Sequence, residues 1–179
     1  FKCVAAACFV FIAGTAHAGR GCEEKPPTAA TLTQALTLAE KTRESLESSY
    51  RQSGTQVALL ARMGQDLSKY GVTYSHAGWA YRQPNGIWRV VHKLNNCGTA
   101  DGFIYRQGLG DFFLDDLYRY QAGITVPTPA VQRALLPYLT SGKVLTMQSQ
   151  PYSMLSYAWG QKYQQSNQWA IETLAAAME

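Results

Sequence analysis

The amino-acid sequence predicts an α+β protein in which a small antiparallel sheet packs against helices. An amphipathic stretch typical of a helix stands near the beginning of the chain, at 31–50, and a second helix is predicted near its end, at 166–178. Between them lie short runs that are typical of strands, at 56–61, 74–81 and 87–92. Apolar residues make up 46% of the chain and charged residues 16%, which is the composition of a folded protein and not of a disordered one.

The beginning of the chain has the pattern of a secretory signal peptide. Lys2 supplies a basic start, a short apolar run follows to Ala13, and Ala16-His17-Ala18 fits a small-x-small cleavage site. We therefore expect residues 1–18 to be removed before Gly19, and the protein to be exported to the periplasm or the extracellular space. The apolar run is shorter than the ~20 residues of a membrane-spanning helix, so we expect no stable membrane span after cleavage.

The cysteines are consistent with an exported protein. Cleavage would leave Cys22 and Cys97 of the four cysteines in the chain. In an oxidising compartment such an even pair is typical of a disulfide, so we expect a Cys22–Cys97 bond. The alternative is that Cys97 is a free, reactive thiol. A lipid anchor on Cys22 fits less well, because Gly19-Arg20-Gly21 is a poor match to the residues that precede such anchors.

Charge gives little sign of a nucleic-acid partner or a metal. The formal net charge of +4 is small, and loss of the signal peptide would lower it by one because Lys2 is its only charged residue. The acidic residues that could join the histidines do not show metal-ligand spacing: Asp101, Asp111, Asp115 and Asp116. The sequence therefore predicts no nucleic-acid partner, no metal and no other cofactor.

The first helix and the first strand are predicted from local patterns. Thr31 to Gln34 resembles a capping box, and Gly54 ends the connection that follows the helix. The apolar residues of the helix lie roughly on one face: Leu32, Leu36, Ala39, Leu46 and Tyr50. The run 56–61 predicts a buried strand, and 63–71 predicts a loop or short helix.

Two of the three histidines fall on one predicted hairpin. His76 lies near the start of the strand 74–81, and His92 ends the strand 87–92, after the turn Gln83-Pro84-Asn85-Gly86. Adjacent strands can bring the two rings together. Histidine is the usual general base near neutral pH, and such a base needs a second polar group that fixes its tautomer. The sequence predicts His76 as the base and His92 as the orienting group. Alternatively, His76 is a structural histidine bonded to backbone groups.

Less distinctive segments follow the hairpin. The aromatic-rich stretch 108–120 predicts a helix or an irregular lid, and the aromatic residues in 112–120 are expected in the core. Thr128-Pro129 is a good N-cap and first residue for a helix that continues to about Leu139. The residues 144–148 predict another strand.

The last helix, 166–178, supplies a candidate nucleophile. Ser166 stands at its beginning, where the helix dipole and unpaired backbone N–H groups favour developing negative charge. The alternative is that Ser166 only caps the helix, since serine is among the best N-cap residues. Trp169 and Leu174 are expected to be core anchors of this helix.

The order of these motifs resembles a bacterial family of unknown function, numbered 2145. Met63-Gly64-Gln65-Asp66-Leu67-Ser68 follows an apolar strand, Tyr74-Ser75-His76-Ala77-Gly78 opens the hairpin, and Ser166-Asn167-Gln168-Trp169 opens the last helix. More distantly, the chain resembles the circularly permuted branch of the papain-like NlpC fold, which includes lecithin:retinol acyltransferase-like proteins. Val90-Val91-His92 is similar to the pattern of that group. The first resemblance covers most of the mature chain, and the second covers chiefly the two strands and the last helix.

These resemblances imply a permuted papain-like fold for residues 19–179 as a single domain. His76 then corresponds to the catalytic histidine, His92 to the third polar residue, and Ser166 to the usual cysteine, with Gln165 in place of the preceding asparagine. The implied function is an exported hydrolase or acyltransferase that acts on an amide or ester bond of a cell-wall peptide or lipid. Because serine depends more on its base than cysteine does, the alternative is an inactive papain-like binding module of the cell envelope.

Overall fold

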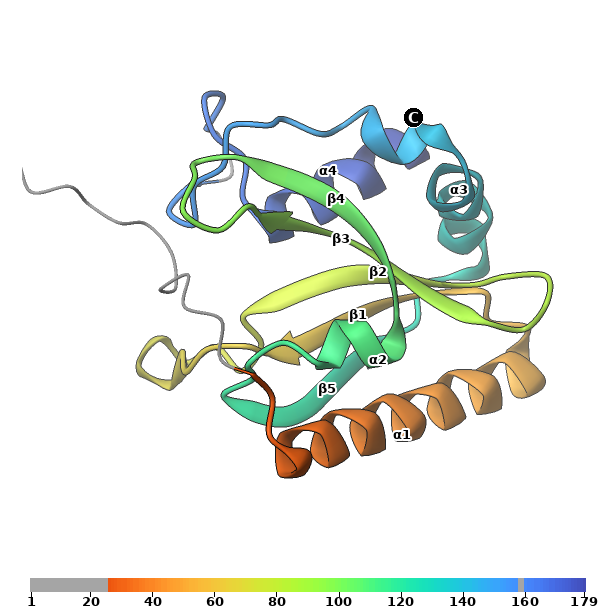
Figure 1. Ribbon diagram of the computed structural model, residues 1–179. Coiled ribbons are helices and arrows are strands. Elements are labelled where there is room, and N and C mark those ends of the chain that lie inside the picture. The colour runs from red at the N-terminus through yellow and green to blue at the C-terminus, as the bar shows by residue number, and fades with distance from the viewer. Residues whose placement is uncertain (1–25, 158–159) are drawn as a thin grey trace, which may run out of the picture.

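The structure is a computed structural model, and it describes residues 26–157 and 160–179 (Figure 1). The expected signal peptide, residues 1–18, lies outside the described residues. Cys22 lies outside them as well. Cleavage before Gly19 and the Cys22–Cys97 disulfide therefore stay predictions.

A five-stranded antiparallel sheet with helices on both sides forms the fold, which confirms the predicted α+β class. The strands are β1 (Val57–Met63), β2 (His76–Arg82), β3 (Trp88–Asn95), β4 (Gly102–Gly108) and β5 (Arg119–Thr125), in the spatial order β4-β3-β2-β1-β5. The helices are α1 (Ala29–Ser53), α2 (Leu109–Phe113), α3 (Pro129–Thr140) and α4 (Ser166–Met178), with the short 3₁₀ turns η1 (Ser68–Tyr70) and η2 (Gly142–Leu145). Among the described residues, no helix has the length and apolar character needed to cross a membrane.

The first helix is longer than predicted. Its N-cap is Thr28, whose extended backbone and side-chain oxygen meet the requirements of a cap; Oγ1 accepts a hydrogen bond from the N–H of Thr31 at 3.2 Å. The predicted capping box at Thr31 is therefore wrong, because the helix has already begun. Gly54 ends it with φ of 70°, and its N–H reaches the carbonyl of Tyr50 at 2.8 Å.

The sheet lies between α1 and α2 on one side and α3 and α4 on the other (Figure 1), and an apolar layer packs on each of its faces. One layer joins α1 and α2 to the sheet: Ala35, Ala39, Leu46, Ala58, Leu60, Ala80, Trp88, Val90, Leu109, Phe112, Phe113 and Leu117. The other joins α3 and α4 to the opposite face: Val57, Trp79, Tyr81, Val91, Leu135, Leu139, Val144, Trp169 and Ala170. Successive strand residues point to opposite faces, so neighbours on β3 such as Val90 and Val91 enter different layers. The predicted core positions of Phe112, Phe113 and Trp169 are confirmed, whereas the core position expected for Tyr118 is wrong, because its side chain is exposed.

The predictions for the later elements were partly wrong. The helix that begins after Thr128 and the short helix within 108–120 are confirmed. The predicted strand at 144–148 is wrong. There the N–H of Thr146 bonds to the carbonyl of Lys143 and the N–H of Gln148 to that of Leu145, so the segment forms local turns. Strands β4 and β5 were not predicted from the sequence.

A half-buried carboxylate connects α1 to the histidine hairpin. Glu47 on α1 accepts hydrogen bonds from Arg82 Nε on β2 at 2.9 Å and from Trp88 Nε1 on β3 at 2.7 Å. The guanidinium of Arg82 also lies 4.0 Å from the centre of the Tyr50 ring. The hydrogen bonds to Arg82, followed by the bond to Trp88, lower the pKa of Glu47. One side chain therefore fixes the helix against both strands.

Substitution of Glu47 by alanine should destabilise the protein. Glu47→Ala leaves the Arg82 guanidinium and the Trp88 indole N–H without their acceptor, and we expect the free energy of unfolding to fall by about 1–2 kcal/mol. Glu40, which pairs with Arg43 on the exposed side of the same helix, is the matched control, and Glu40→Ala should have no measurable effect. Urea unfolding of the two variants tests this, and equal effects would contradict it.

Candidate functional site

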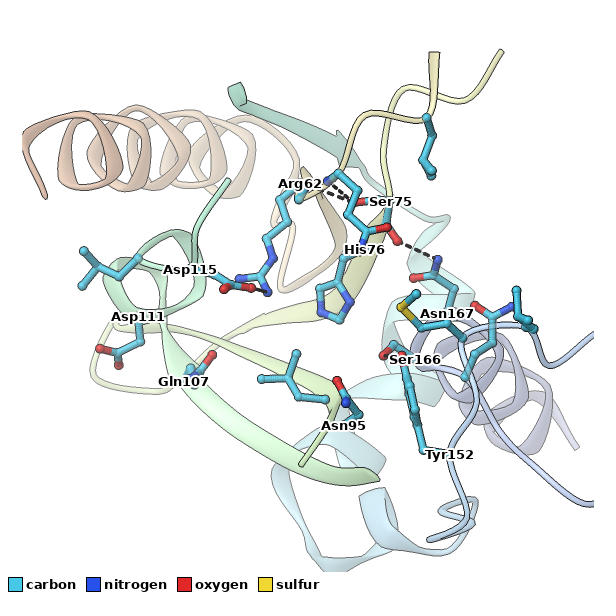
Figure 2. Close-up of a pocket in the computed structure, with 18 of the residues that line it drawn as sticks. Arg62, Ser75, His76, Asn95, Gln107, Asp111, Asp115, Tyr152, Ser166 and Asn167 are labelled. Atoms are coloured by element: carbon cyan, nitrogen blue, oxygen red, sulfur yellow. Dashed lines mark hydrogen bonds and ion pairs between the residues drawn. The ribbon is translucent and has the colours of Figure 1, made fainter. Parts of the chain in front are cut away.

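His76 and Ser166 line the same cleft, which has a volume of about 880 Å³. The cleft lies where β2 begins, β3 ends and α4 begins. Figure 2 shows His76 near its middle, with Gln107 and Asp115 on one side and Tyr152 and Ser166 on the other. The structure thus brings the predicted base and the predicted nucleophile, which are 90 positions apart in the chain, to one open site.

The two histidines form a hydrogen-bonded pair across β2 and β3. His76 Nε2 lies 2.8 Å from His92 Nδ1, and the ring centres are 5.1 Å apart in an edge-to-face arrangement. His92 Nε2 lies 2.6 Å from the side-chain oxygen of Gln107 on β4. The predicted pairing of His76 with His92 is confirmed by this geometry. The alternative of a histidine satisfied only by backbone groups does not fit it.

This chain of hydrogen bonds fixes the tautomers of both rings. The oxygen of Gln107 can only accept, so His92 carries its proton on Nε2 and, when neutral, presents a lone pair on Nδ1. His76 must then donate from Nε2. The remaining ring nitrogen of His76, Nδ1, is left with a lone pair, which is the state that a general base requires.

The close approach of the rings requires glycine at position 78. A Cβ atom there would lie 2.8 Å from the Cβ of His92 and 2.9 Å from the carbonyl oxygen of Val91. Such distances are too short for non-bonded carbon and oxygen atoms, so the strands would have to separate. Phe112 of α2 closes the site from the α1 side, with its ring edge-on to His92 at 5.1 Å between centres.

Desolvation favours the neutral form of both histidines. His92 is fully buried; burial, and then the nearby Arg62 cation, lower its pKa to about 4 against an opposing effect of Gln107. Burial is also the main cause that lowers the pKa of His76 well below its usual value, with Arg62 and His92 adding to the effect. His76 is therefore a neutral base and not half of an ion pair.

The cation beside the histidines comes from β1. The side chain of Arg62 is almost fully buried; its guanidinium donates to the carbonyl of Phe112 and pairs with Asp115 at 2.5 Å. It also lies over the Phe112 ring at 4.7 Å. Arg62 is thus held close to the histidine pair, where its charge opposes protonation of the rings.

Ser166 begins α4 but does not cap it. The N-cap is Gln165, and the hydroxyl of Ser166 lies 3.2 Å from that of Tyr152. The alternative that Ser166 is only a cap is therefore not supported. Within the described part of the chain, no hydrogen bond joins Ser166 to the ring of His76. The backbone N–H groups of Ser166 and Asn167 also have no acceptor there, so they could bind an oxyanion.

Asn167 fastens the start of α4 to the start of β2. Its side-chain oxygen accepts from the N–H of Ala77 at 2.9 Å, and its amide nitrogen donates to the carbonyl of Ser75 at 3.3 Å. These bonds place the nucleophile helix beside the base strand. Asn167 was not predicted as a site residue, because its partners Ala77 and Ser75 lie 90 and 92 positions away in the chain. Gln107 was missed because β4 was not predicted.

The site offers general-base chemistry with a hydroxyl nucleophile and backbone N–H groups for an oxyanion. Residues 26–157 and 160–179 contain no group of three or more histidine, cysteine or acidic side chains that could hold a metal ion.

The histidine pair, with His92 fully buried, should make stability depend on pH. The unfolded chain binds a proton on His92 near pH 6.5, whereas the folded protein resists protonation until about pH 4. The free energy of unfolding is therefore highest above pH 6.5, where His92 is neutral in both states. It decreases as the pH falls and is about 3 kcal/mol lower at pH 4. His76 acts in the same direction.

Urea unfolding at several pH values tests this dependence. In His92→Gln the free energy of unfolding should fall less steeply from pH 6.5 to pH 4 than in the wild type. An identical slope in both proteins would show that His92 does not titrate in this way.

Comparison with other proteins identifies a family. A family model described as uncharacterized protein conserved in bacteria (DUF2145) matches residues 49–179, which include every residue of the candidate site discussed above. No curated protein and no solved structure matches the chain. Because the match spans most of the chain, the protein belongs to the DUF2145 family of bacterial proteins.

Proposed function

We propose that the protein is an exported hydrolase or acyltransferase that acts on an amide or ester bond through Ser166, His76 and His92. One observation carries the proposal. The chain of hydrogen bonds from Gln107 through His92 leaves a lone pair on Nδ1 of His76, which can act as a general base in the cleft that Ser166 also lines. A neutral histidine suits a serine nucleophile, which must lose its proton during attack.

Each residue has a defined role in this mechanism. Nδ1 of His76 accepts the proton of Ser166 as Oγ attacks the carbonyl carbon of the substrate. The N–H groups of Ser166 and Asn167 stabilise the oxyanion. His92 holds His76 in its tautomer and shares the charge of the imidazolium that forms. The imidazolium then protonates the leaving group, and water or a second acceptor removes the acyl group from Ser166.

We infer a circularly permuted papain-like fold from the order of the elements. The histidine strand β2 precedes the nucleophile helix α4, and α4 packs on the sheet, with Trp79 Nε1 donating to the carbonyl of Ala170 at 2.9 Å. The predicted signal peptide supports a periplasmic or extracellular location, so a cell-wall peptide or an envelope lipid is the proposed substrate.

A second candidate is a binding module of the cell envelope that keeps the cleft without catalysis. The observation that favours it is the position of Ser166, which is only 6% exposed and whose hydroxyl contacts Tyr152. In the enzyme this hydroxyl must turn towards His76 when substrate binds, as is common where hydrogen bonds of the free enzyme are loose. In the binding module it stays with Tyr152.

Labelling with a fluorophosphonate probe separates the two candidates. Peptide mass spectrometry of the purified mature protein should show the probe on Ser166, and His76→Ala should slow labelling by about 100-fold because the base is lost. Ser75 is an internal control: its hydroxyl also lines the cleft but accepts from the N–H groups of Gly64 and Gln65, so it should stay unlabelled.

The opposite outcome is equally informative. A folded protein that leaves Ser166 unlabelled would favour the binding module, and pull-downs with cell-wall and lipid fragments would then be the next measurement. Labelling of Ser166 that is unaffected by His76→Ala would refute the assignment of His76 as the base.

A further inference from the structure

A second titratable residue lies next to His92 on β3. Lys93 points to the opposite face of the sheet, towards α4, and is fully buried. Its ammonium donates to the side-chain oxygen of Gln164 at 2.7 Å and to the carbonyl of Ser149. The proposed mechanism does not use this cation, although burying an ammonium group is costly unless it is well paired.

Gln164, which lies just before α4, links Lys93 to the segment 147–152. Its oxygen also accepts from the N–H of Ser149 at 3.0 Å, and its nitrogen donates to the carbonyl of Met147 at 2.7 Å and to Glu172 of α4. Lys93 and Gln164 therefore fasten the segment 147–152 to the beginning of α4.

Both the segment and Gln164 lie close to Ser166. Gln164 precedes Ser166 by two positions, and Tyr152 brings its hydroxyl within 3.2 Å of the Ser166 hydroxyl. The Tyr152 ring centre lies 5.8 Å from the Lys93 ammonium. A Cβ at Gly102 would lie 2.6 Å from Lys93 Cε and 2.8 Å from Tyr152 Cδ2, so these two side chains fill the space tightly.

We propose that Lys93 is a positioning residue that sets the place of Ser166 through Gln164 and Tyr152. This inference rests on the proposed function, in which Ser166 is the nucleophile. Strand β3 then orders both halves of the site: His92 orients the base on one face, and Lys93 orients the nucleophile on the other. A displacement of about 1 Å at a reacting group is enough to slow a reaction strongly.

Replacement of the lysine tests the inference. Lys93→Met keeps the length and apolar stem but removes the ammonium, and we expect fluorophosphonate labelling of Ser166 to slow by at least about tenfold per folded molecule. Arg106→Met is the matched control, because Arg106 is also a cation on this face that donates to a carbonyl, that of Leu139, and lies over a tyrosine ring, that of Tyr81. The control should label at the wild-type rate.

The pH profile separates positioning from a general loss of structure. Burial lowers the pKa of Lys93 to about 8, against the effect of Glu172 on α4; Tyr152, whose ring lies beside the ammonium, is the other titratable residue near it. His76 is already neutral above pH 6.5, so wild-type labelling should decline as the pH rises through about 8 and Lys93 loses its proton. In Lys93→Met this decline should be absent.

A second variant covers the case in which Lys93→Met does not fold. Gln164→Met removes the acceptor of Lys93 and should slow labelling similarly; the double variant should be no slower than the slower single variant if both act through one link. Folded Lys93→Met or Gln164→Met protein that labels at the wild-type rate would overturn the inference while leaving the proposed function intact.

A wild type that is not labelled would refute the proposed function instead. Crystal structures of the wild type and Lys93→Met then decide the positioning role. A Tyr152–Ser166 distance that stays at 3.2 Å without the lysine contradicts the inference, and loss of this contact supports it.

Discussion

The rest of the site depends on the alternation of side chains along β3. Two consecutive residues, His92 and Lys93, are both buried, but they enter opposite layers of the fold. Each can be buried only because a neighbouring element supplies a partner: Gln107 of β4 for the histidine, and Gln164 before α4 for the lysine. A shift of β3 by one residue would exchange the two faces and leave both groups without these partners.

Desolvation determines the chemistry that this arrangement can support. A thiolate nucleophile works best beside a protonated histidine, whereas a serine needs a neutral base. Desolvation of His76 and His92, with the guanidinium of Arg62 close by, favours the neutral form of both rings. The serine at the start of α4 and the electrostatics of the histidines are therefore consistent with each other.

The sequence predicted the elements that have strong local signals. The apolar run of β1, the hairpin with its Pro-Asn-Gly turn, the Thr128 cap of α3 and the last helix were all identified. Contacts between distant segments were not predictable in this way. Gln107 and Asn167 act through partners 15 and 90 positions away, respectively, so no local pattern marks them. The edge strand β4 was missed, although its sequence begins and ends with glycine, at Gly102 and Gly108, and has aromatic residues at the alternate positions 103 and 105.

Gly78 gives the histidine pair a signature that can be recognised in other sequences. Every other amino acid carries a Cβ, so no substitution at this position could keep the two strands at their present distance around the rings. The pattern is a histidine, any residue and then a glycine on one strand, with a second histidine opposite the glycine on the next strand. A chain with both histidines but a larger residue in place of the glycine would have to hold its imidazoles farther apart, and could not pass a proton directly between them.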